Sequence, residues 1–215
     1  MSNHCSKCGS ANFTAAKDCS RCGSWLGIER RGSRTFGAKL ARRATVFVLV
    51  CVTLLAGFYL SLIGSANRLT LIQKQSMRSA VAIVRQKGFT DEALLLENLA
   101  AFRSSDNWLN ASVAKENAYA ATNFPFEIVT LYPDFFTYPA DDTERAAILL
   151  HEARHLAGKD EHDAYEFVWK HRQQLGWTAE FYRESPVWQN VRRQTQENVP
   201  ELFVCDRSEA GDCTQ

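Results

Sequence analysis

The chain has 215 residues, of which 46% are hydrophobic and 23% charged, and its formal net charge is +1. This composition is ordinary for a globular protein, and a net charge near zero gives no reason to expect a nucleic-acid partner. Cysteines and apolar residues are distributed unevenly along the chain. Four of the seven cysteines lie within residues 1–22, and the longest apolar run is confined to residues 44–64.

Residues 1–28 contain two Cys-x-x-Cys-Gly pairs, formed by Cys5 with Cys8 and by Cys19 with Cys22. Four thiolates with this spacing suit tetrahedral zinc coordination, and the glycine after each pair lets the backbone turn around the metal. The pattern resembles the short zinc ribbons at the ends of many bacterial proteins, which implies a closed, structural zinc site. Two disulfides are the alternative, and they would need an oxidising compartment.

Residues 29–43 form a basic linker, and residues 44–64 carry no charge. About 20 apolar residues match the thickness of a bilayer's hydrocarbon core, so residues 44–64 are predicted to form one transmembrane helix. The basic flank should remain on the cytosolic side. We therefore expect a single-pass protein of the inner (cytoplasmic) membrane, with the ribbon in the cytosol and residues 65–215 in the periplasm or outside the cell.

Two further cysteines, Cys205 and Cys213, lie near the C-terminus and are separated by a polar segment. In an oxidising space outside the cytosol they would close a small disulfide loop. Two free thiols at a frayed terminus are the alternative.

The outer segment, residues 65–215, is long enough for one compact core and is predicted to be mainly helical. Helices are expected over residues 69–87, from a cap at Thr90, over residues 141–157 and 160–175, after a cap at Thr178, and from Pro186. Residues 111–121 suggest a short helix. Residues 126–132 are rich in β-branched and aromatic types and predict a strand. The expected class is α+β with a minor strand or small sheet.

The motif His151-Glu152-Ala153-Arg154-His155 follows an apolar helical run. Histidines four residues apart lie on one face of a helix, about one turn from each other, so they can share one zinc ion. Glu152 follows the first histidine directly, and its carboxylate can take a proton from a water molecule at the metal. The motif is typical of zinc-dependent hydrolases, usually peptidases.

Catalytic zinc usually has three protein ligands, so a third is expected beyond the motif. Gly158 is suited to end the helix in the left-handed conformation, after which the chain can return to the metal. Glu161, three residues past the glycine, is the preferred ligand, and His162 is the alternative. Asp163 and Glu166 are weaker candidates, because acidic residues at a helix start are favoured by its dipole in any case.

The pattern H-E-x-x-H-x-x-G-x-x-E, over residues 151–161, resembles the zincin peptidases that reverse direction at a glycine after the second histidine. Metzincins usually place a histidine three residues past that glycine, whereas deuterolysin-like aspzincins use an aspartate in a comparable place, followed by a tyrosine. The following helix also resembles that of gluzincins, in which a glutamate is the third ligand. The resemblance covers about residues 125–175 and implies Glu161 as a ligand. It also implies Tyr165 as an oxyanion donor, although the spacing to Tyr165 differs from the family's.

These patterns together predict a membrane-anchored zinc peptidase that acts on a peptide or protein substrate, with Glu152 as general base. Two alternatives keep the zinc and omit the catalysis. The outer domain could be a metal-stabilised scaffold, with the ribbon recruiting a cytosolic partner, or it could be a sensor that signals through the span. A structural site has no need for Glu152, so this residue favours the enzyme.

Overall fold

The computed structural model describes residues 2–27, 34–110 and 119–203. The chain divides into two compact units, Met1–Leu55 and Ala56–Gln215. Cys205 and Cys213 lie outside the described residues, so the predicted disulfide between them stays a prediction.

The first unit begins with a small antiparallel hairpin of β1 (Ser2–His4) and β2 (Ala11–Phe13), in which Asn3 pairs with Asn12. An isolated bridge between Asp18 and Trp25 closes the second half of this small module. The module has almost no apolar interior, because its buried side chains are chiefly Cys5 and Cys19.

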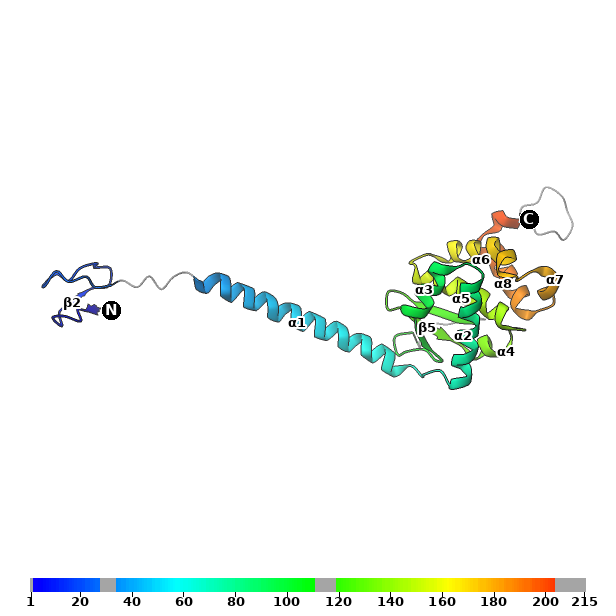
Figure 1. Ribbon diagram of the computed structural model, residues 1–215, viewed down its shortest axis with the longest axis horizontal. Helices are drawn as coiled ribbons and strands as arrows, with labels where there is room; N and C mark the ends of the chain where they lie inside the picture. Colours follow the sequence, from blue (N-terminus) through cyan, green and yellow to red (C-terminus); the bar gives the residue numbers. More distant parts are fainter. Residues whose placement is uncertain (1, 28–33, 111–118, 204–215) are drawn as a thin grey trace. The chain divides into compact units, whose positions relative to one another are not determined.

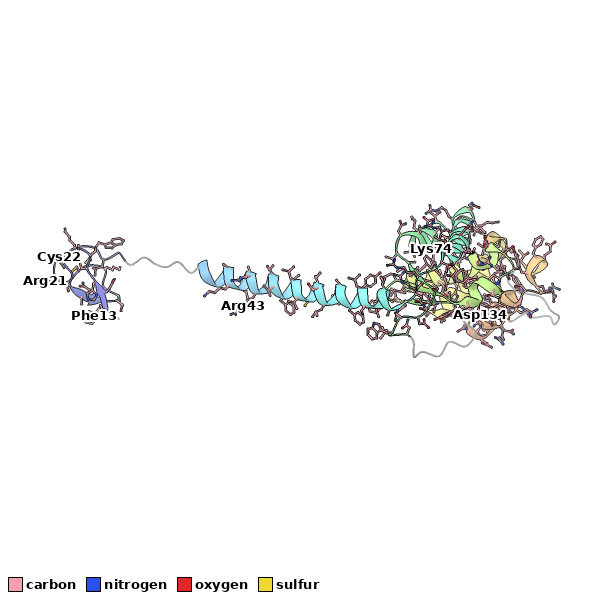
Figure 2. All side chains as sticks on the ribbon, turned by 90° about the horizontal axis from the view of Figure 1, so that it is seen from below. Phe13, Arg21, Cys22, Arg43, Lys74 and Asp134 are labelled. Atoms are coloured by element: carbon pink, nitrogen blue, oxygen red, sulfur yellow. The ribbon has the colours of Figure 1, made fainter. Side chains whose placement is uncertain are left out.

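Helix α1 (Arg34–Ser65) contains the predicted membrane span. Its segment Gly37–Ser65 is long and apolar enough to cross a membrane, and only a small share of it is buried inside the protein. Side chains project outward all along the helix, with Arg43 near its start (Figure 2). The helix starts at Arg34, inside the stretch predicted as a linker, because residues 34–43 contain no proline and few helix-breaking residues.

The outer unit is mostly helical, as predicted, with a small sheet (Figure 1). Its helices are α2 (Leu71–Gln86), α3 (Thr90–Asn98), α4 (Pro133–Thr137), α5 (Asp142–Leu156), α6 (Glu161–Leu175), α7 (Ala179–Tyr182), α8 (Pro186–Asn198) and the 3-10 helix η1 (Pro200–Phe203). The predicted helices at residues 69–87, 141–157, 160–175 and from Pro186 are confirmed. Thr90 is the first residue of α3 rather than its cap, which is Phe89.

The sheet has three strands in the order β3-β5-β4, formed by β3 (Ala101–Arg103), β4 (Ala120–Asn123) and β5 (Ile128–Leu131). The predicted strand at residues 126–132 is β5, which pairs with β3 in parallel and with β4 antiparallel. The prediction of a helix over residues 111–121 is wrong at its end, because Ala120 and Ala121 belong to β4. Pairing with β5 outweighs the helix preference of alanine.

Helix α5 lies in the core of the outer unit and packs against α2, α3, α6 and β4 (Figure 1). Ala146, Ala147 and Ile148 to Leu150 are all buried, as expected for a helix covered on several sides. Trp169 and Trp177 are fully buried and pack with Trp188, whose ring centroid is 4.7 Å from that of Trp177. These aromatic side chains therefore form core.

The N-terminus of α5 is fixed by two acidic side chains. Asp141 caps the helix by accepting hydrogen bonds from the backbone N–H groups of Thr143 and Glu144. The fully buried Glu144 accepts hydrogen bonds from Trp177 Nε1 at 3.1 Å and from Ser185 Oγ at 2.6 Å. The helix that carries the H-E-x-x-H motif is thereby held to the segment between α6 and α8.

Candidate metal centres

His151 and His155 lie one turn apart on α5, and their Nε2 atoms are 3.0 Å from each other. The ring of His155 is oriented by a second contact, because its Nδ1 lies 2.9 Å from the carbonyl oxygen of Lys159. Metal-binding histidines commonly use the ring nitrogen away from the metal in this way, which fixes the tautomer that leaves Nε2 as the ligand atom.

Gly158 reverses the chain directly after α5, with a φ of +74° that favours glycine. Asp160 then caps α6, and Glu161 is the first residue of that helix. The two carboxylate oxygens of Glu161 lie 3.2 Å from His151 Nε2 and 3.5 Å from His155 Nε2. The reversal expected from the sequence thus brings Glu161 to the two histidines.

The three side chains fit a zinc ion. One ligand atom from each of His151, His155 and Glu161 lies within 4.8 Å of the others. Ligand atoms bound at zinc's usual bond length of about 2.1 Å in a tetrahedron are about 3.4 Å apart. The two Nε2 atoms are 3.0 Å apart, and each lies within 3.5 Å of one of the two Glu161 oxygens, so the group is compact enough to surround one ion. Two imidazoles and one carboxylate also form a donor set that catalytic zinc sites use.

The charges within this group are strongly coupled. Burial lowers the pKa of His155, but its hydrogen bonds to Glu161 and Lys159 outweigh burial and raise the pKa to about 9. The hydrogen bonds to His151 and His155 hold the pKa of Glu161 far below its usual range. Glu161 therefore remains a carboxylate at every physiological pH, which is the form that binds a metal.

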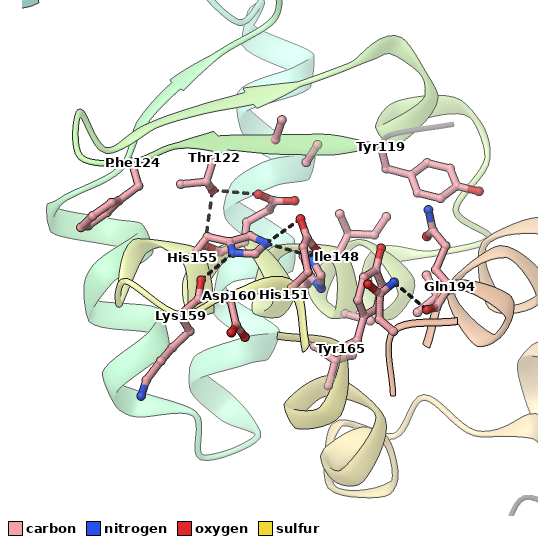
Figure 3. Close-up of a pocket in the computed structure, with 18 of the residues that line it drawn as sticks. Tyr119, Thr122, Phe124, Ile148, His151, His155, Lys159, Asp160, Tyr165 and Gln194 are labelled. Atoms are coloured by element: carbon pink, nitrogen blue, oxygen red, sulfur yellow. Dashed lines mark hydrogen bonds and ion pairs between the residues drawn. The ribbon is translucent and has the colours of Figure 1, made fainter. Parts of the chain in front are cut away.

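Glu152 is only 4% exposed and lies beside β4. Thr122 Oγ1 donates a hydrogen bond of 2.7 Å to Glu152 Oε2, and within the described part of the chain Oε1 has no hydrogen-bond partner (Figure 3). Thr122 comes from an edge strand that the sequence did not predict, so its contact with the proposed general base was missed. No motif marks it, because the contact joins residues 30 positions apart.

His162 lies outside the site, although it is the neighbour of Glu161. Its Nε2 is 2.8 Å from Glu201 Oε1, and both side chains are largely exposed. Adjacent residues on a helix point about 100° apart, so both could not reach one metal. Asp163 is also engaged elsewhere, because it accepts a hydrogen bond from Arg154.

Tyr165 packs its ring against His151, with ring centroids 4.4 Å apart. Burial, reinforced by the charges of Glu161 and Glu152, raises the pKa of its hydroxyl above the ordinary value, so the group stays protonated at physiological pH. The structure places Tyr165 beside the metal ligands, and its role as an oxyanion donor stays a prediction.

The metal-binding group opens into a cleft of about 820 Å³. Strand β4 and the adjoining residue Phe124 form one wall, and residues of α5, α6, α8 and the turn between α5 and α6 form most of the rest. The lining includes His151, Glu152 and Tyr165, so the proposed ligands, base and tyrosine all face one space (Figure 3). A molecule in this cleft would lie within reach of each of them.

The four cysteines of the first unit form a second group that can hold a metal such as zinc. Cys5 Sγ lies 3.7 Å from Cys22 Sγ, and Cys8 Sγ lies 3.5 Å from Cys19 Sγ, with no disulfide between them. Sulfur atoms around one tetrahedral zinc are about 3.8 Å apart. This agreement favours the metal over the two disulfides.

Hydrogen bonds lower the pKa of two of these thiols, Cys5 and Cys19. A hydrogen bond with Ser24, together with backbone N–H groups, lowers the pKa of Cys5 to about 6. The backbone N–H groups of Arg21 and Cys22 likewise lower the pKa of Cys19. Both shifts favour the thiolate, which is the form that binds zinc.

The chain matches no protein-family model, no curated protein and no solved structure. The functional conclusion therefore depends on the geometry of the two centres and on the motifs that build them.

Proposed function

We propose that the protein is a membrane-anchored zinc peptidase whose active centre is formed by His151, Glu152, His155 and Glu161. The observation that carries the proposal is the position of Glu152. Its carboxylate faces the same cleft as the three candidate ligands, and Thr122 holds one of its oxygens. The likeness of the H-E-x-x-H-x-x-G-x-x-E motif to zincin peptidases supports the same conclusion.

The form of the site favours catalysis over a structural role. Structural zinc sites are closed by four protein ligands, as in the proposed ribbon, whereas catalytic sites have three and leave a position open. The outer group has three candidate ligands among the described residues, and it lines an open cleft. A structural zinc would also have no use for a nearly buried carboxylate beside it.

In the proposed reaction, zinc held by His151, His155 and Glu161 would supply a Lewis acid that polarises the scissile carbonyl and acidifies a water molecule. Glu152 takes the proton from the attacking water through its free oxygen and later delivers it to the leaving amine. Thr122 holds the other oxygen and so fixes the direction in which Glu152 points. Tyr165 would donate a hydrogen bond to the oxyanion.

The edge of β4 offers a place for an extended polypeptide. The predicted strand at residues 126–132 is β5, which lies between β3 and β4 and so has no free edge within the described sheet. Strand β4 is at the edge and lines the cleft through Ala120 to Asn123. A substrate could pair with the edge of β4 that no other described strand covers, and so cross the metal site in an extended form.

The ribbon and helix α1 complete the proposal. We propose that α1 spans the cytoplasmic membrane, with the ribbon in the cytosol and the outer domain in the periplasm or outside the cell. Phe13 and Trp25 are exposed on the ribbon, which favours binding to a cytosolic protein. This surface also fits the alternative of a scaffold or sensor, in which the outer site binds without hydrolysing.

The deciding experiment replaces Glu152 by glutamine in the full-length protein. An amide cannot accept the proton of the attacking water, so Glu152→Gln should lose peptide hydrolysis. Its zinc content and its thermal unfolding should match those of the unchanged protein. A peptide library supplies substrates of many sequences, so the cleavage specificity need not be established first. Hydrolysis at the normal rate in this variant would remove Glu152 from the mechanism and favour the scaffold or sensor.

A further inference from the structure

We infer that the metal cleft opens at the membrane surface, and that its substrate is a membrane-anchored polypeptide cut close to the point where it leaves the bilayer. The substrate class depends on the proposed peptidase function. The position of the cleft depends only on how the end of α1 packs within the outer unit.

The last turns of α1 are built into the outer unit. Leu62 is completely buried, and Arg103 Nε donates a hydrogen bond of 3.2 Å to the carbonyl oxygen of Ile63. Trp108 contributes two more contacts, through its backbone N–H to Ser65 Oγ at 3.2 Å and through Nε1 to Ser61 Oγ at 3.3 Å. The end of α1, residues 61–65, is therefore part of the packed outer unit.

Trp108 marks the depth of the membrane surface. It contacts Ser61, which lies within the predicted span of residues 44–64, and its ring packs edge-on against Phe58. Even so, 53% of Trp108 is exposed. Tryptophan is favoured at the interface between lipid and water, where its ring meets lipid and its N–H finds a polar partner. The interface therefore passes through the level of Trp108.

The turn between β4 and β5 reaches the same depth. Phe126 in this turn packs against Phe58, with ring centroids 5.5 Å apart. Phe58 precedes Ser61 by three residues, so it lies about 4.5 Å further into the span. Phe124, on the same turn, is an aromatic side chain with 57% of its surface exposed. Leu71 and Ile72, exposed at the start of α2, add apolar surface shortly after the end of α1.

This turn is also part of the cleft. Phe124 lines the cleft, and its ring lies 3.8 Å from the position that a Cβ on Gly158 would occupy. The next residue, Lys159, holds the ligand His155 through its carbonyl oxygen. Figure 3 shows Phe124 at the end of the strand that passes above His155. A short series of contacts therefore links the membrane helix to the metal site.

The direction of β4 determines the direction in which a bound polypeptide substrate can run. The strand runs from Ala120 to Asn123 and leads directly into the turn at Phe124. A polypeptide paired with its edge must run along the same line, toward or away from the bilayer. Four strand residues cover about 13 Å, so the bond at the metal would lie on the order of ten residues or fewer from the membrane. A membrane-anchored chain provides such a segment.

The position of the cleft can be tested without catalysis. A photo-reactive benzophenone amino acid would replace Phe124 in the full-length protein, reconstituted in vesicles of phosphatidylethanolamine and phosphatidylglycerol. Phe181 is the matched control, because it is 74% exposed and lies on α7, far from the end of α1 (Figure 1). We expect at least tenfold more lipid cross-linking from position 124 than from 181. Equal labelling would overturn the membrane-facing cleft.

The substrate class is tested in the same vesicles. Two substrates would carry one cleavable segment, taken from the peptide library, joined to a transmembrane helix by a linker of about ten residues. In the second substrate, a small folded domain separates the segment from the membrane. We expect the first to be cut at least tenfold faster, and equal rates would refute the inference. If position 124 labels lipid but no peptide is cut, the proposed hydrolysis fails while the membrane-facing cleft stands.

Discussion

The hydrogen bond from Thr122 to Glu152 can be removed with little change in shape. Thr122→Val replaces the hydroxyl that donates the 2.7 Å hydrogen bond by a methyl group. Hydrogen bonds to charged groups contribute about 1.5–3 kcal/mol. Thr122 is half-buried at the wall of an open cleft, so the lower value applies. A loss of about 1.5 kcal/mol in the transition state corresponds to a decrease of about tenfold in kcat.

The assay compares kcat and zinc content for the unchanged protein, Thr122→Val and Thr122→Ser, on one peptide selected from a library. Serine keeps the hydroxyl, so Thr122→Ser should recover most of the activity. Thr122 has no hydrogen bond to a metal ligand within the described part of the chain, so zinc affinity should be the same in all three. If the kcat of Thr122→Val stays within about twofold of that of the unchanged protein, the loss is well short of the expected tenfold. Glu152 would then be oriented by other contacts. Equal losses in both variants would assign the effect to the shape of the side chain.

Three further predictions concern the metals and the membrane. Full-length protein should bind one zinc ion at each of the two centres, and Cys5→Ser combined with Cys8→Ser should remove only the ribbon's zinc, as metal analysis would show. Glu161→Ala should weaken zinc binding at the outer centre by at least about 100-fold, because loss of a residue that only supports a ligand already costs about 10- to 100-fold. His162→Ala should leave zinc binding unchanged. The opposite result in zinc titrations would make His162 the ligand. A reporter enzyme that works only outside the cytosol should be active when fused after Gln215, whereas activity of a cytosolic reporter there would reverse the topology.

Local patterns were enough to predict several parts of the protein. The positions of His151 and His155 follow from the period of a single helix, because residues four apart always share a face. The start of α5 and the reversal at Gly158 are equally local, since each satisfies or redirects the backbone within a few residues. Length and the absence of charge were likewise sufficient to identify the membrane helix as a candidate.

Other features depended on contacts between distant segments. The sequence left Glu161 and His162 as alternatives, and the angle at which α6 leaves the turn places Glu161 at the histidines. An alanine-rich stretch gave no sign that Thr122 would lie on an edge strand beside Glu152, because pairing with β5 creates that strand. The packing of Phe126 against Phe58 also joins residues far apart in sequence. Periodicity reports which face of an element is buried, but only tertiary packing decides what lies against that face.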